Sequence, residues 1–397
     1  MNIRPATFAD ARRVHEIRNA PSSREWSNNK NEIAWDDHER WFRRQYAPDS
    51  PHRCYVLDVA DRVVGYCRFD ATKEGGGFLL SIALDPDECG KGYGTRFLVG
   101  AIRAFASRQP LLAEVLTGNE VSHKLFRKTG FRVALVDERR VLYRFDPPIF
   151  AYGLKLWTSN AERFADAARL YEAGMVDFIE LYLNPASSSG SEELRALDGV
   201  PVEIHAPNTH GFHELVIGRE QLAIWSDVLA LADRFRSRRI VLHPGRDHTL
   251  SSFQQEFAKL EDPRVLIENM PGRDTFGKEM FGKQLSDLER VRETHEICFD
   301  LEKAAKAAAF LGCDHREYVA DALELLSPRY FHISGGDASS PIDQHLNVWE
   351  GSIDFPALKR LIEAQSGDEA SRMVFEVPKT SGDLSNDLKN MDYFRSL

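Results

Sequence analysis

The sequence predicts two α/β domains in one chain, a smaller α+β domain followed by a (β/α)₈ barrel. The chain has 397 residues, which exceeds one ordinary hydrophobic core and suits two domains of unequal size. After residue 150, short β-rich runs alternate with helical stretches in the order of a barrel. The stiff segment Asp146-Pro147-Pro148 separates the two parts, so we predict domains at residues 1–147 and 148–397.

Composition restricts the classes of protein to which the chain can belong. No run approaches the roughly 18 consecutive apolar residues of a membrane span, and the N-terminus lacks the apolar stretch of a secretory signal. The five cysteines form no Cys-x-x-Cys pair, so neither a disulfide framework nor a cysteine zinc site is indicated. We expect a cytoplasmic protein without a membrane partner, and the sequence does not indicate its oligomeric state.

Charge is distributed unevenly between the two parts. Residues 1–150 carry 24 Lys and Arg against 20 Asp and Glu, whereas residues 151–397 carry 27 against 41, a net charge of −14. Such an acidic barrel should repel a phosphate backbone, unless a local basic stripe or bound metals reverse the field. The sequence therefore disfavours nucleic acid as a partner and favours a small-molecule substrate.

Alternating apolar residues predict a mixed sheet with helices in the first domain. The runs 54–59 and 62–70 are expected to pair across a turn at Ala60-Asp61. Further strands are expected at 78–84, 112–117, 131–136 and 140–145, and helices at 7–18, 96–107 and 119–128.

Eight strands are expected in the second domain. They lie at 152–157, 178–183, 200–205, 239–243, 265–268, 297–300, 330–333 and 373–377, with helices such as 161–173, 219–236 and 317–326 between them. A doubly wound open sheet is the alternative. The polar residues at the strand ends favour the barrel.

A glycine-rich turn, Gly90-Lys91-Gly92-Tyr93-Gly94-Thr95, lies between a predicted strand and a predicted helix. Closely spaced glycines let backbone N–H groups approach a ligand, and a helix N-terminus attracts phosphate. A tight turn without a ligand is the alternative. Downstream, Asn119-x-x-Ser122 opens the next helix and Gly130-Phe131 ends it.

In order and spacing, these motifs resemble the GNAT acetyltransferases over about residues 1–146. The resemblance implies acetyl-CoA as cofactor. The pyrophosphate would lie on Gly90, Lys91, Gly92, Tyr93, Gly94 and Thr95, the strand from Ile82 to Leu84 would pair with the pantetheine arm, and Asn119 and Ser122 would lie beside that arm.

Two residues depart from the GNAT pattern. Cys89 stands where the family usually has Gln or Arg, and Phe126 stands where it often has a tyrosine that protonates the leaving thiolate. Because phenylalanine cannot donate a proton, another group or water would act, or the thiolate would leave unassisted. Glu88, Asp70 and Tyr143 are candidates for the general base, and a surface or structural role explains each of them as well.

The acceptor side is indicated by residues 34–42, Ala-Trp-Asp-Asp-His-Glu-Arg-Trp-Phe. His38 followed by Trp41-Phe42, with Arg18-Asn19 upstream, resembles the GNAT branch that acetylates amino sugars on nucleotide carriers. The resemblance implies an amino-sugar acceptor. The alternative is an amphipathic helix that buries its aromatic residues in the core.

Polar residues end six successive strands of the predicted barrel, and two more follow in a loop. They are His205, His243, Glu268, Asp300, His332 and Glu376 on strands 3 to 8, and Asp343 and His345 after strand 7. The strand C-termini form the active-site mouth of such a barrel. Carboxylates that converge there need counter-charge, which a divalent metal supplies. The pattern therefore predicts a site for zinc, manganese or magnesium.

This order resembles the xylose-isomerase-like barrels, which include sugar isomerases, epimerases and the endonuclease IV branch, over about residues 151–397. The sugar-epimerase branch has four core ligands, here Glu268, Asp300, His332 and Glu376, and Glu180 matches an acidic position on its strand 2. The endonuclease branch adds ligands that correspond to His205, His243, Asp343 and His345.

One departure from the endonuclease pattern disfavours DNA cleavage. Lys303 stands where that branch has a histidine ligand, and a protonated lysine cannot bind a metal. Lys303 would instead bind a substrate phosphate or carboxylate, or transfer a proton. The alternative is a surface lysine on a helix.

We therefore predict a bifunctional enzyme of amino-sugar or nucleotide-sugar metabolism. The first domain would transfer acetyl from acetyl-CoA to an amine, and the barrel would isomerise, epimerise or hydrolyse a related sugar. Glu268, Glu376 and Lys303 are the catalytic candidates: two carboxylates across one metal would exchange a proton, or two metals bridged by Glu268 would activate water. The alternatives are a DNA-repair nuclease fused to an acetyltransferase, and a barrel that only binds a ligand.

Overall fold

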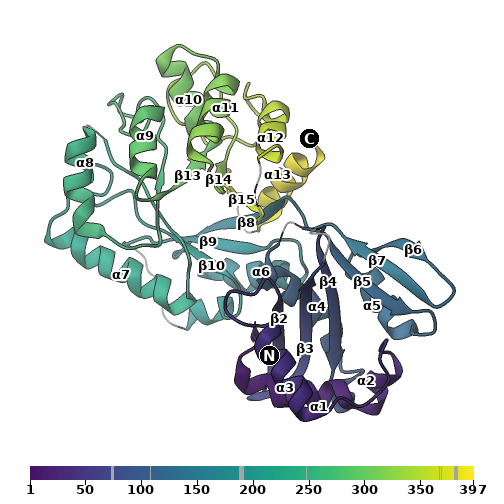
Figure 1. Ribbon diagram of the computed structural model, residues 1–397. Helices are drawn as coiled ribbons and strands as arrows, with labels where there is room; N and C mark the ends of the chain where they lie inside the picture. The colour runs from purple at the N-terminus through teal and green to yellow at the C-terminus, as the bar shows by residue number, and fades with distance from the viewer. Residues whose placement is uncertain are drawn as a thin grey trace. The chain divides into compact units, whose positions relative to one another are not determined.

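The computed structural model describes residues 1–72, 76–107, 109–186, 192–246, 248–365, 367, 369–379 and 383–397. The chain divides into two compact units, Met1–Pro148 and, apart from the short segment 367–370, residues 149–397 (Figure 1). Among the described helices, none is long and apolar enough to cross a membrane.

The first unit is built on a seven-stranded sheet with the order β1-β2-β3-β4-β5-β7-β6. Its strands are β1 (Asn2–Pro5), β2 (Arg53–Val59), β3 (Arg62–Ala71), β4 (Phe78–Leu84), β5 (Leu111–Leu116), β6 (Arg132–Val136) and β7 (Arg140–Phe145). Neighbouring strands are antiparallel except β4 and β5. The predicted turn is confirmed, since Ala60 and Asp61 join β2 to β3 with φ angles of 49° and 59°.

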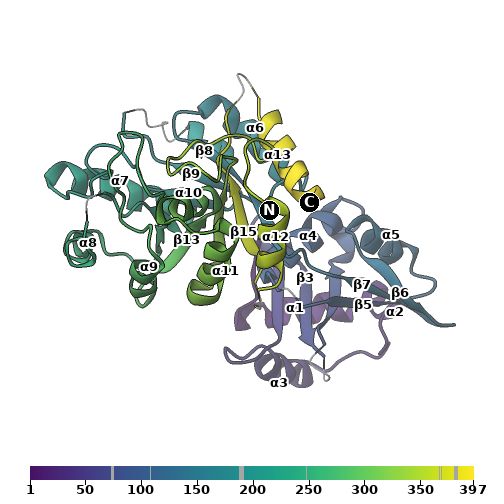
Figure 2. The ribbon, with the colours of Figure 1, turned by 90° about the horizontal axis from the view of Figure 1, so that it is seen from above.

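Helices cover both faces of this sheet (Figure 2). They are α1 (Ala11–Asn19), α2 (Pro21–Glu25), α3 (Trp35–Gln45), α4 (Tyr93–Phe105) and α5 (Glu120–Lys128), with short 3-10 turns η1 (Phe8–Asp10) and η2 (Pro86–Glu88). A separate hydrophobic core lies on each face of the sheet, and successive residues of β2 point to opposite faces. Val56 packs with α1 and α3, whereas Leu57 packs in the core that α4 and α5 share.

The second unit is a closed barrel of eight strands, and every neighbouring pair is parallel. Its strands are β8 (Phe150–Trp157), β9 (Phe178–Tyr182), β10 (Val202–His205), β11 (Ile240–Leu242), β12 (Val265–Glu268), β13 (Glu296–Asp300), β14 (Tyr330–Ile333) and β15 (Ser371–Phe375). The predicted (β/α)₈ barrel is therefore confirmed, and the open sheet is wrong.

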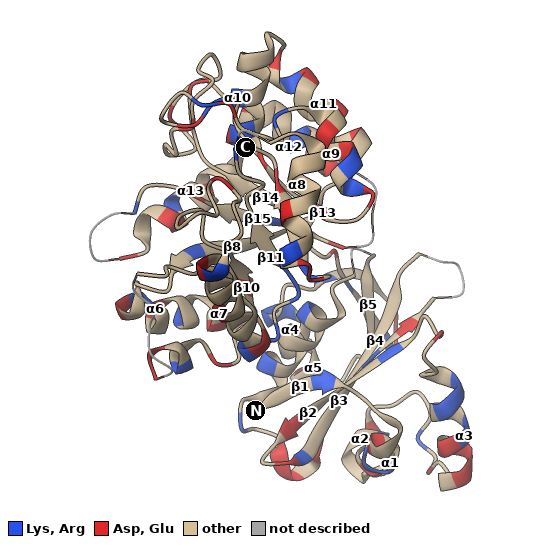
Figure 3. Cartoon of the chain, turned by 90° about the vertical axis from the view of Figure 1, so that its left-hand side faces the viewer, with Lys and Arg blue, Asp and Glu red and all other residues tan. Residues whose placement is uncertain are grey.

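Helices surround the barrel, and the strands are almost wholly buried beneath them. They are α6 (Ala161–Glu172), α7 (Arg219–Phe235), α8 (Leu250–Phe257), α9 (Leu285–Arg292), α10 (Leu301–Leu311), α11 (His315–Leu326), α12 (Phe355–Glu363) and α13 (Ser385–Ser396), with 3-10 turns η3 (Glu193–Leu197) and η4 (Ala258–Leu260). Acidic and basic positions are interspersed on outer helices such as α9 and α11 (Figure 3).

A small apolar core fills the inside of the barrel. It consists of Phe178, Val241, Leu266, Cys298, Tyr330 and Val374, one residue from each of six strands. Gly153 of β8 makes room for it, because a Cβ at that position would come within 2.5 Å of the Phe178 ring.

Candidate functional sites

Eight polar side chains, one from each strand or the residue directly after it, form one layer inside the barrel, which we call the polar layer. Its members are Lys155, Glu180, His205, His243, Glu268, Asp300, His332 and Glu376. Six of them stand two positions after a residue of the inner apolar core. Because side chains alternate along a strand, that spacing directs them to the same inward face. The sequence-predicted residues of the six strand ends are thus brought together.

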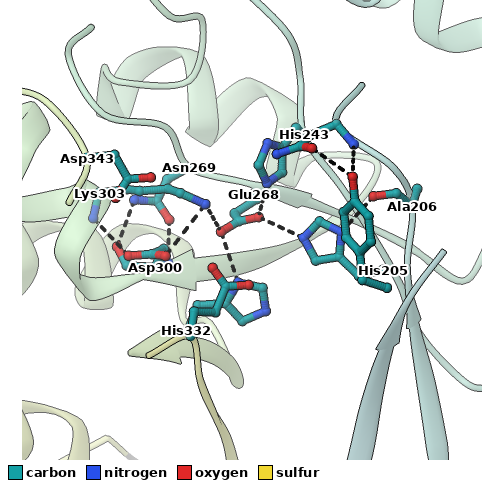
Figure 4. A network of polar contacts seen from close by, with 12 residues as sticks. His205, Ala206, His243, Glu268, Asn269, Asp300, Lys303, His332 and Asp343 are labelled. Carbon is teal, nitrogen blue, oxygen red and sulfur yellow. Dashed lines mark hydrogen bonds and ion pairs between the residues drawn. The ribbon is translucent and has the colours of Figure 1, made fainter. Parts of the chain in front are cut away.

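Glu268 lies at the centre of the polar layer, with different groups on its two oxygens (Figure 4). Its Oε2 lies 2.8 Å from His243 Nε2 and 3.5 Å from His205 Nε2. Its Oε1 lies 3.0 Å from His332 Nδ1 and 2.5 Å from Lys303 Nζ. Glu268 therefore joins a histidine-rich side of the layer to a side that contains a lysine.

Lys155 was not predicted, and it joins two carboxylates of the layer. Its Nζ lies 2.5 Å from Glu180 Oε1 and 2.5 Å from Glu376 Oε1, and its side chain is 3% exposed. Glu180 also accepts a hydrogen bond from the hydroxyl of Tyr330 at 2.6 Å and lies 2.9 Å from His332 Nε2. A lysine inside the apolar run 151–157 is a signal that could have identified this residue.

Lys303 lies inside the barrel, with only 2% of its side chain exposed, so the surface alternative is wrong. The reason is local: Asp300 caps α10, and its Oδ1 accepts a hydrogen bond from the Lys303 backbone N–H at 2.8 Å. The first turn of the helix therefore starts at the layer itself. Lys303 Nζ contacts Glu268 and lies 3.6 Å from Asp300 Oδ2.

Asp343 and His345 lie in the loop between β14 and α12, at the edge of the polar layer. Their side chains are 3.0 Å apart, and His345 Nδ1 lies 3.7 Å from Glu376 Oε2. Buried Glu302 holds this loop, because its carboxylate accepts hydrogen bonds from the backbone N–H groups of Gln344 and His345. Sequence reasoning missed Glu302, whose position next to Lys303 in an alanine-rich helix carries little signal.

Burial and neighbouring charges shift the pKa values of the polar layer in opposite directions. Burial lowers the pKa of His243 to about 4 and raises the pKa of Asp300 to about 6. Burial also raises the pKa of Glu268, but the charges of Lys303, His332 and His243 outweigh it and hold that pKa well below its usual value. Burial lowers the pKa of His332, but its acidic neighbours hold it well above the usual value.

The donor set of this region fits a divalent cation. Glu268 Oε2, Asp300 Oδ2 and Asp343 Oδ1 are buried and accept no hydrogen bond from the described residues. Ligand atoms converge within 4.8 Å in five sets, among them those of Glu268, Asp300, His332 and Glu376, and those of His205, His243 and Glu268. Buried carboxylate oxygens without hydrogen-bond partners are costly, and a cation would offset that cost.

In the first unit, β4 and β5 part after a short stretch of pairing. Register pairs join Phe78 to Leu111 and Leu79 to Leu112, whereas β4 continues to Leu84 and β5 to Leu116. The edge of β4 that includes Ile82 and Leu84 therefore pairs with no strand of the described chain on the β5 side.

The glycine-rich turn follows β4 and η2 and leads into α4. Gly90 and Gly92 both have φ of 82°, a left-handed conformation that favours glycine, and Gly92 is the N-cap of α4. A Cβ at either glycine would have no neighbour within 4 Å, so no packing within the chain demands glycine here. Tyr93, Gly94 and Thr95 form the first turn of α4, and Lys91 is exposed and pairs with Glu88. The backbone N–H groups at this helix start are available to an anion.

Asn119 and Ser122 have a structural role that the sequence did not separate from cofactor binding. Asn119 is the N-cap of α5, and its Oδ1 accepts a hydrogen bond from the Ser122 backbone N–H at 3.1 Å. Tyr143, a candidate base, is fully buried. His123 Nε2 lies 3.2 Å from the carbonyl of Thr117, which can only accept, so its Nδ1 accepts from the Tyr143 hydroxyl at 2.9 Å.

The segment 34–42 contains the N-cap and the first turns of α3. Two of its residues are buried in the core, as the alternative to an acceptor site predicted. His38 is 3% exposed and donates from Nε2 to the carbonyl of Ala11 at 3.1 Å, and Phe42 is 2% exposed. Burial lowers the pKa of His38 to about 4. Trp41 is only partly buried and lies 5.2 Å from the Arg68 guanidinium. The predicted Asp70 base contacts Gln45 and Tyr46.

Residues 1–132 match the family model described as an acetyltransferase (GNAT) domain. The first unit carries a GNAT domain. No curated protein sequence matches the chain. Endonuclease IV from Thermus thermophilus is similar to 62% of this chain over 98% of its own, at 20% identity and a TM-score of 0.49.

Two acetyltransferase structures are similar to a smaller part of this chain. Ribosomal-protein-alanine N-acetyltransferase from Brucella melitensis covers 37% of this chain and 100% of its own, at 21% identity and a TM-score of 0.33. Spermidine N-acetyltransferase from Vibrio cholerae, in complex with CoA and spermine, covers 36% and 92%, at 15% identity and a TM-score of 0.31. The predictions of an amino-sugar acceptor and of a sugar-type barrel substrate stay predictions.

Proposed function

We propose that the chain is a bifunctional enzyme: the GNAT domain transfers acetyl from acetyl-CoA to an amine, and the barrel uses a divalent metal on a small polar substrate of the sugar type. One observation in each unit carries this proposal. In the GNAT domain it is the parting of β4 from β5 next to the glycine-rich turn. In the barrel it is the convergence of eight polar side chains on one layer.

The parted strands suit an extended cofactor arm. A pantetheine chain carries two amides, which can hydrogen-bond to the free edge of β4 near Ile82 and Leu84, while the N–H groups of the turn 90–95 bind the pyrophosphate. The partly buried Trp41 of α3 and the guanidinium of Arg68 next to it support an amine acceptor that carries a flat or anionic group. A nucleotide-linked amino sugar is such an acceptor.

The acetyltransferase proposal is tested by release of CoA. The full chain is incubated with acetyl-CoA and a panel of amines (free amino sugars, nucleotide-linked amino sugars, amino acids and polyamines), and the free thiol is measured with a thiol reagent. With at least one amino sugar, we expect CoA to be released faster than by the hydrolysis of acetyl-CoA in water alone. If isothermal titration detects no binding of acetyl-CoA, the proposal is wrong for this domain.

A bound metal would be held by ligands from the predicted set, His205, His243, Glu268, Asp300, His332, Asp343, His345 and Glu376. When bound, a divalent ion polarises a carbonyl or hydroxyl group, or lowers the pKa of water. The chain's own carboxylates, Glu268 and Glu376, would move protons at the substrate, and Lys303 would hold an anionic group of the substrate next to them.

Elemental analysis of the purified full chain tests the barrel part. We expect a divalent transition metal that is lost in a Glu268→Ala, His332→Ala double variant and kept in a His295→Ala, Glu296→Ala control. His295 and Glu296 lie at the start of β13, away from the polar layer, and provide the same two residue types. A wild-type chain that binds no metal even when metal is supplied would contradict a catalytic barrel.

A phosphodiesterase that acts on DNA is the second candidate, favoured by the approach of His205 and His243 to Glu268. The −14 charge of residues 151–397 and the lysine at position 303 oppose it. Cleavage of a duplex with one abasic site, measured at low salt, separates the candidates. Efficient cleavage that depends on metal would favour the nuclease over the sugar enzyme.

A further inference from the structure

Lysine contacts divide the ligand-type side chains of the polar layer into two halves. In the lysine half, which consists of Glu180, Asp300, His332, Glu376 and the Oε1 of Glu268, every carboxylate lies within 3.6 Å of an ammonium group. Lys155 serves two of these carboxylates, and Lys303 serves the other two.

The histidine half consists of His205, His243 and the Oε2 of Glu268. Among the described residues, no lysine contacts this oxygen, and no hydrogen bond satisfies it although Glu268 is fully buried. His243 Nε2 approaches it to 2.8 Å, and His205 Nε2 lies 3.5 Å from it. The metal-ligand atoms of these three residues lie within 4.8 Å of one another, close enough to share one ion.

The ring of His205 is oriented for metal binding by a backbone group. Its Nδ1 lies 2.7 Å from the carbonyl oxygen of Ala206, which can only accept, so Nδ1 carries the hydrogen. In the neutral ring, Nε2 is then a lone-pair donor, and it faces Glu268 Oε2. A backbone carbonyl on the second nitrogen is the usual support of a histidine that binds a metal.

The chemistry of the two halves differs. Two imidazole nitrogens and one carboxylate oxygen, with a fourth position open, are the ligands of catalytic zinc sites. A divalent ion in the lysine half would instead stand next to two fixed ammonium groups, which repel it and already contact one oxygen each of Glu180, Glu268 and Glu376. The ammonium groups offset the same negative charge that an ion would offset.

We propose that the barrel binds a single transition-metal ion through His205, His243 and Glu268, and that Lys155 and Lys303 take the place of further ions in the lysine half. This inference rests on the proposed function in one respect, namely that the barrel binds a metal. Within the polar layer, it narrows the predicted ligands from six residues to three. It also assigns the two lysines a common role as built-in cations.

Metal stoichiometry of the full chain tests the inference, with zinc as the probe. The chain is stripped with a chelator, reloaded with excess Zn²⁺, desalted and analysed by mass spectrometry for zinc and protein together. We expect one zinc per chain. His243→Asn should lose it, whereas Asp300→Asn, an isosteric change of a carboxylate in the lysine half, should keep it. X-ray absorption at the zinc edge should show two imidazole nitrogens.

A second experiment removes one of the two lysines that we propose as built-in cations. Lys303→Met frees Glu268 Oε1 and the Asp300 carboxylate, so we expect it to bind two zinc ions, whereas Lys389→Met, which changes a lysine of α13 outside the polar layer, should bind one. Circular dichroism confirms that each variant is folded. Two or more zinc ions in the unaltered chain, or loss of zinc in Asp300→Asn but not in His243→Asn, would overturn the inference and leave the proposed metal enzyme standing. No zinc at all would overturn both.

Discussion

The two units differ in the parts of the chain that would contact a ligand. In the GNAT domain they are backbone groups, namely the free edge of β4 and the N–H groups of the turn 90–95. In the barrel they are eight buried or nearly buried side chains, one from each strand or the residue after it. The first site should therefore be sensitive to changes of backbone conformation, and the second to the loss of a single charge.

Loss of one buried charge in the barrel should give the largest effect. Lys155→Met leaves Glu180 and Glu376 without their shared ammonium group. Removing one partner of a buried ion pair costs about 3–5 kcal/mol, so we expect that decrease in the free energy of unfolding of the metal-free chain. Hydrogen exchange of peptides from β8, β9 and β15 would measure it.

Lys389 of α13, outside the polar layer, provides the control for this change. Lys389→Met should alter stability by no more than about 0.5 kcal/mol. Equal effects of the two variants would show that the charge on Lys155 does not stabilise the layer, and would weaken the contrast between the units.

In the GNAT domain, one buried ionisable group, His38, should make the free energy of unfolding depend on pH. His38 is buried, no carboxylate among the described residues pairs with it, and burial lowers its pKa to about 4. Because the unfolded histidine titrates near 6.5, the unfolded chain binds the proton first as the pH falls. Stability is therefore complete above about pH 6.5 and is lost as the pH falls toward 4, by about 2–3 kcal/mol in all.

The variant His38→Gln keeps an N–H donor for the Ala11 carbonyl and does not titrate. We expect it to flatten this part of the pH dependence, measured by hydrogen exchange of peptides from Met1–Pro148. An unchanged slope between pH 4 and 6.5 would show that other groups cause the acid sensitivity.

Six residues of the polar layer were predictable because six successive strands end in, or directly before, a residue whose type is rare in a core. Glu268 and Asp300 end buried apolar runs, and parallel strands bring their ends to one rim. The role of Lys155 was not predictable, because its partners stand 25 and 221 residues away. Only the closed barrel makes β15 a neighbour of β8 and thereby brings Glu376 to Lys155.

In the GNAT domain, the sequence predicted the strands and turns better than the functions of single residues. The strand 78–84 and the turn at Ala60-Asp61 agree with the structure, because local spacing determines them. The role of Asn119 stayed open, since the same residue type caps a helix and binds an amide of a cofactor. The short strand β1 was missed because its four residues show no alternating pattern.

Backbone change in the glycine-rich turn should give a smaller effect on stability and a specific effect on binding. Gly92→Ala forces a side chain into a left-handed conformation, which costs about 1–2 kcal/mol. Gly199 of the barrel is the matched control, since its φ is 87° and a Cβ there also has no neighbour within 4 Å. We expect similar losses of stability from both variants, whereas only Gly92→Ala should weaken acetyl-CoA binding in isothermal titration. Equal affinities would argue against a cofactor on this turn.

The smallest expected effect concerns the cap of α5 and decides whether Asn119 has a second role. Asn119→Ala should lower the stability of the GNAT domain by about 1 kcal/mol, the usual value of an N-cap. Asp354 is the matched cap of α12 in the barrel, where its carboxylate accepts a hydrogen bond from the Ala357 backbone N–H at 3.1 Å. If Asn119 acts only as a cap, both alanine variants bind acetyl-CoA as the unaltered chain does. We expect instead that Asn119→Ala alone weakens binding, because its side chain stands at the start of the helix that follows β5, the strand that parts from β4 where we propose the cofactor arm.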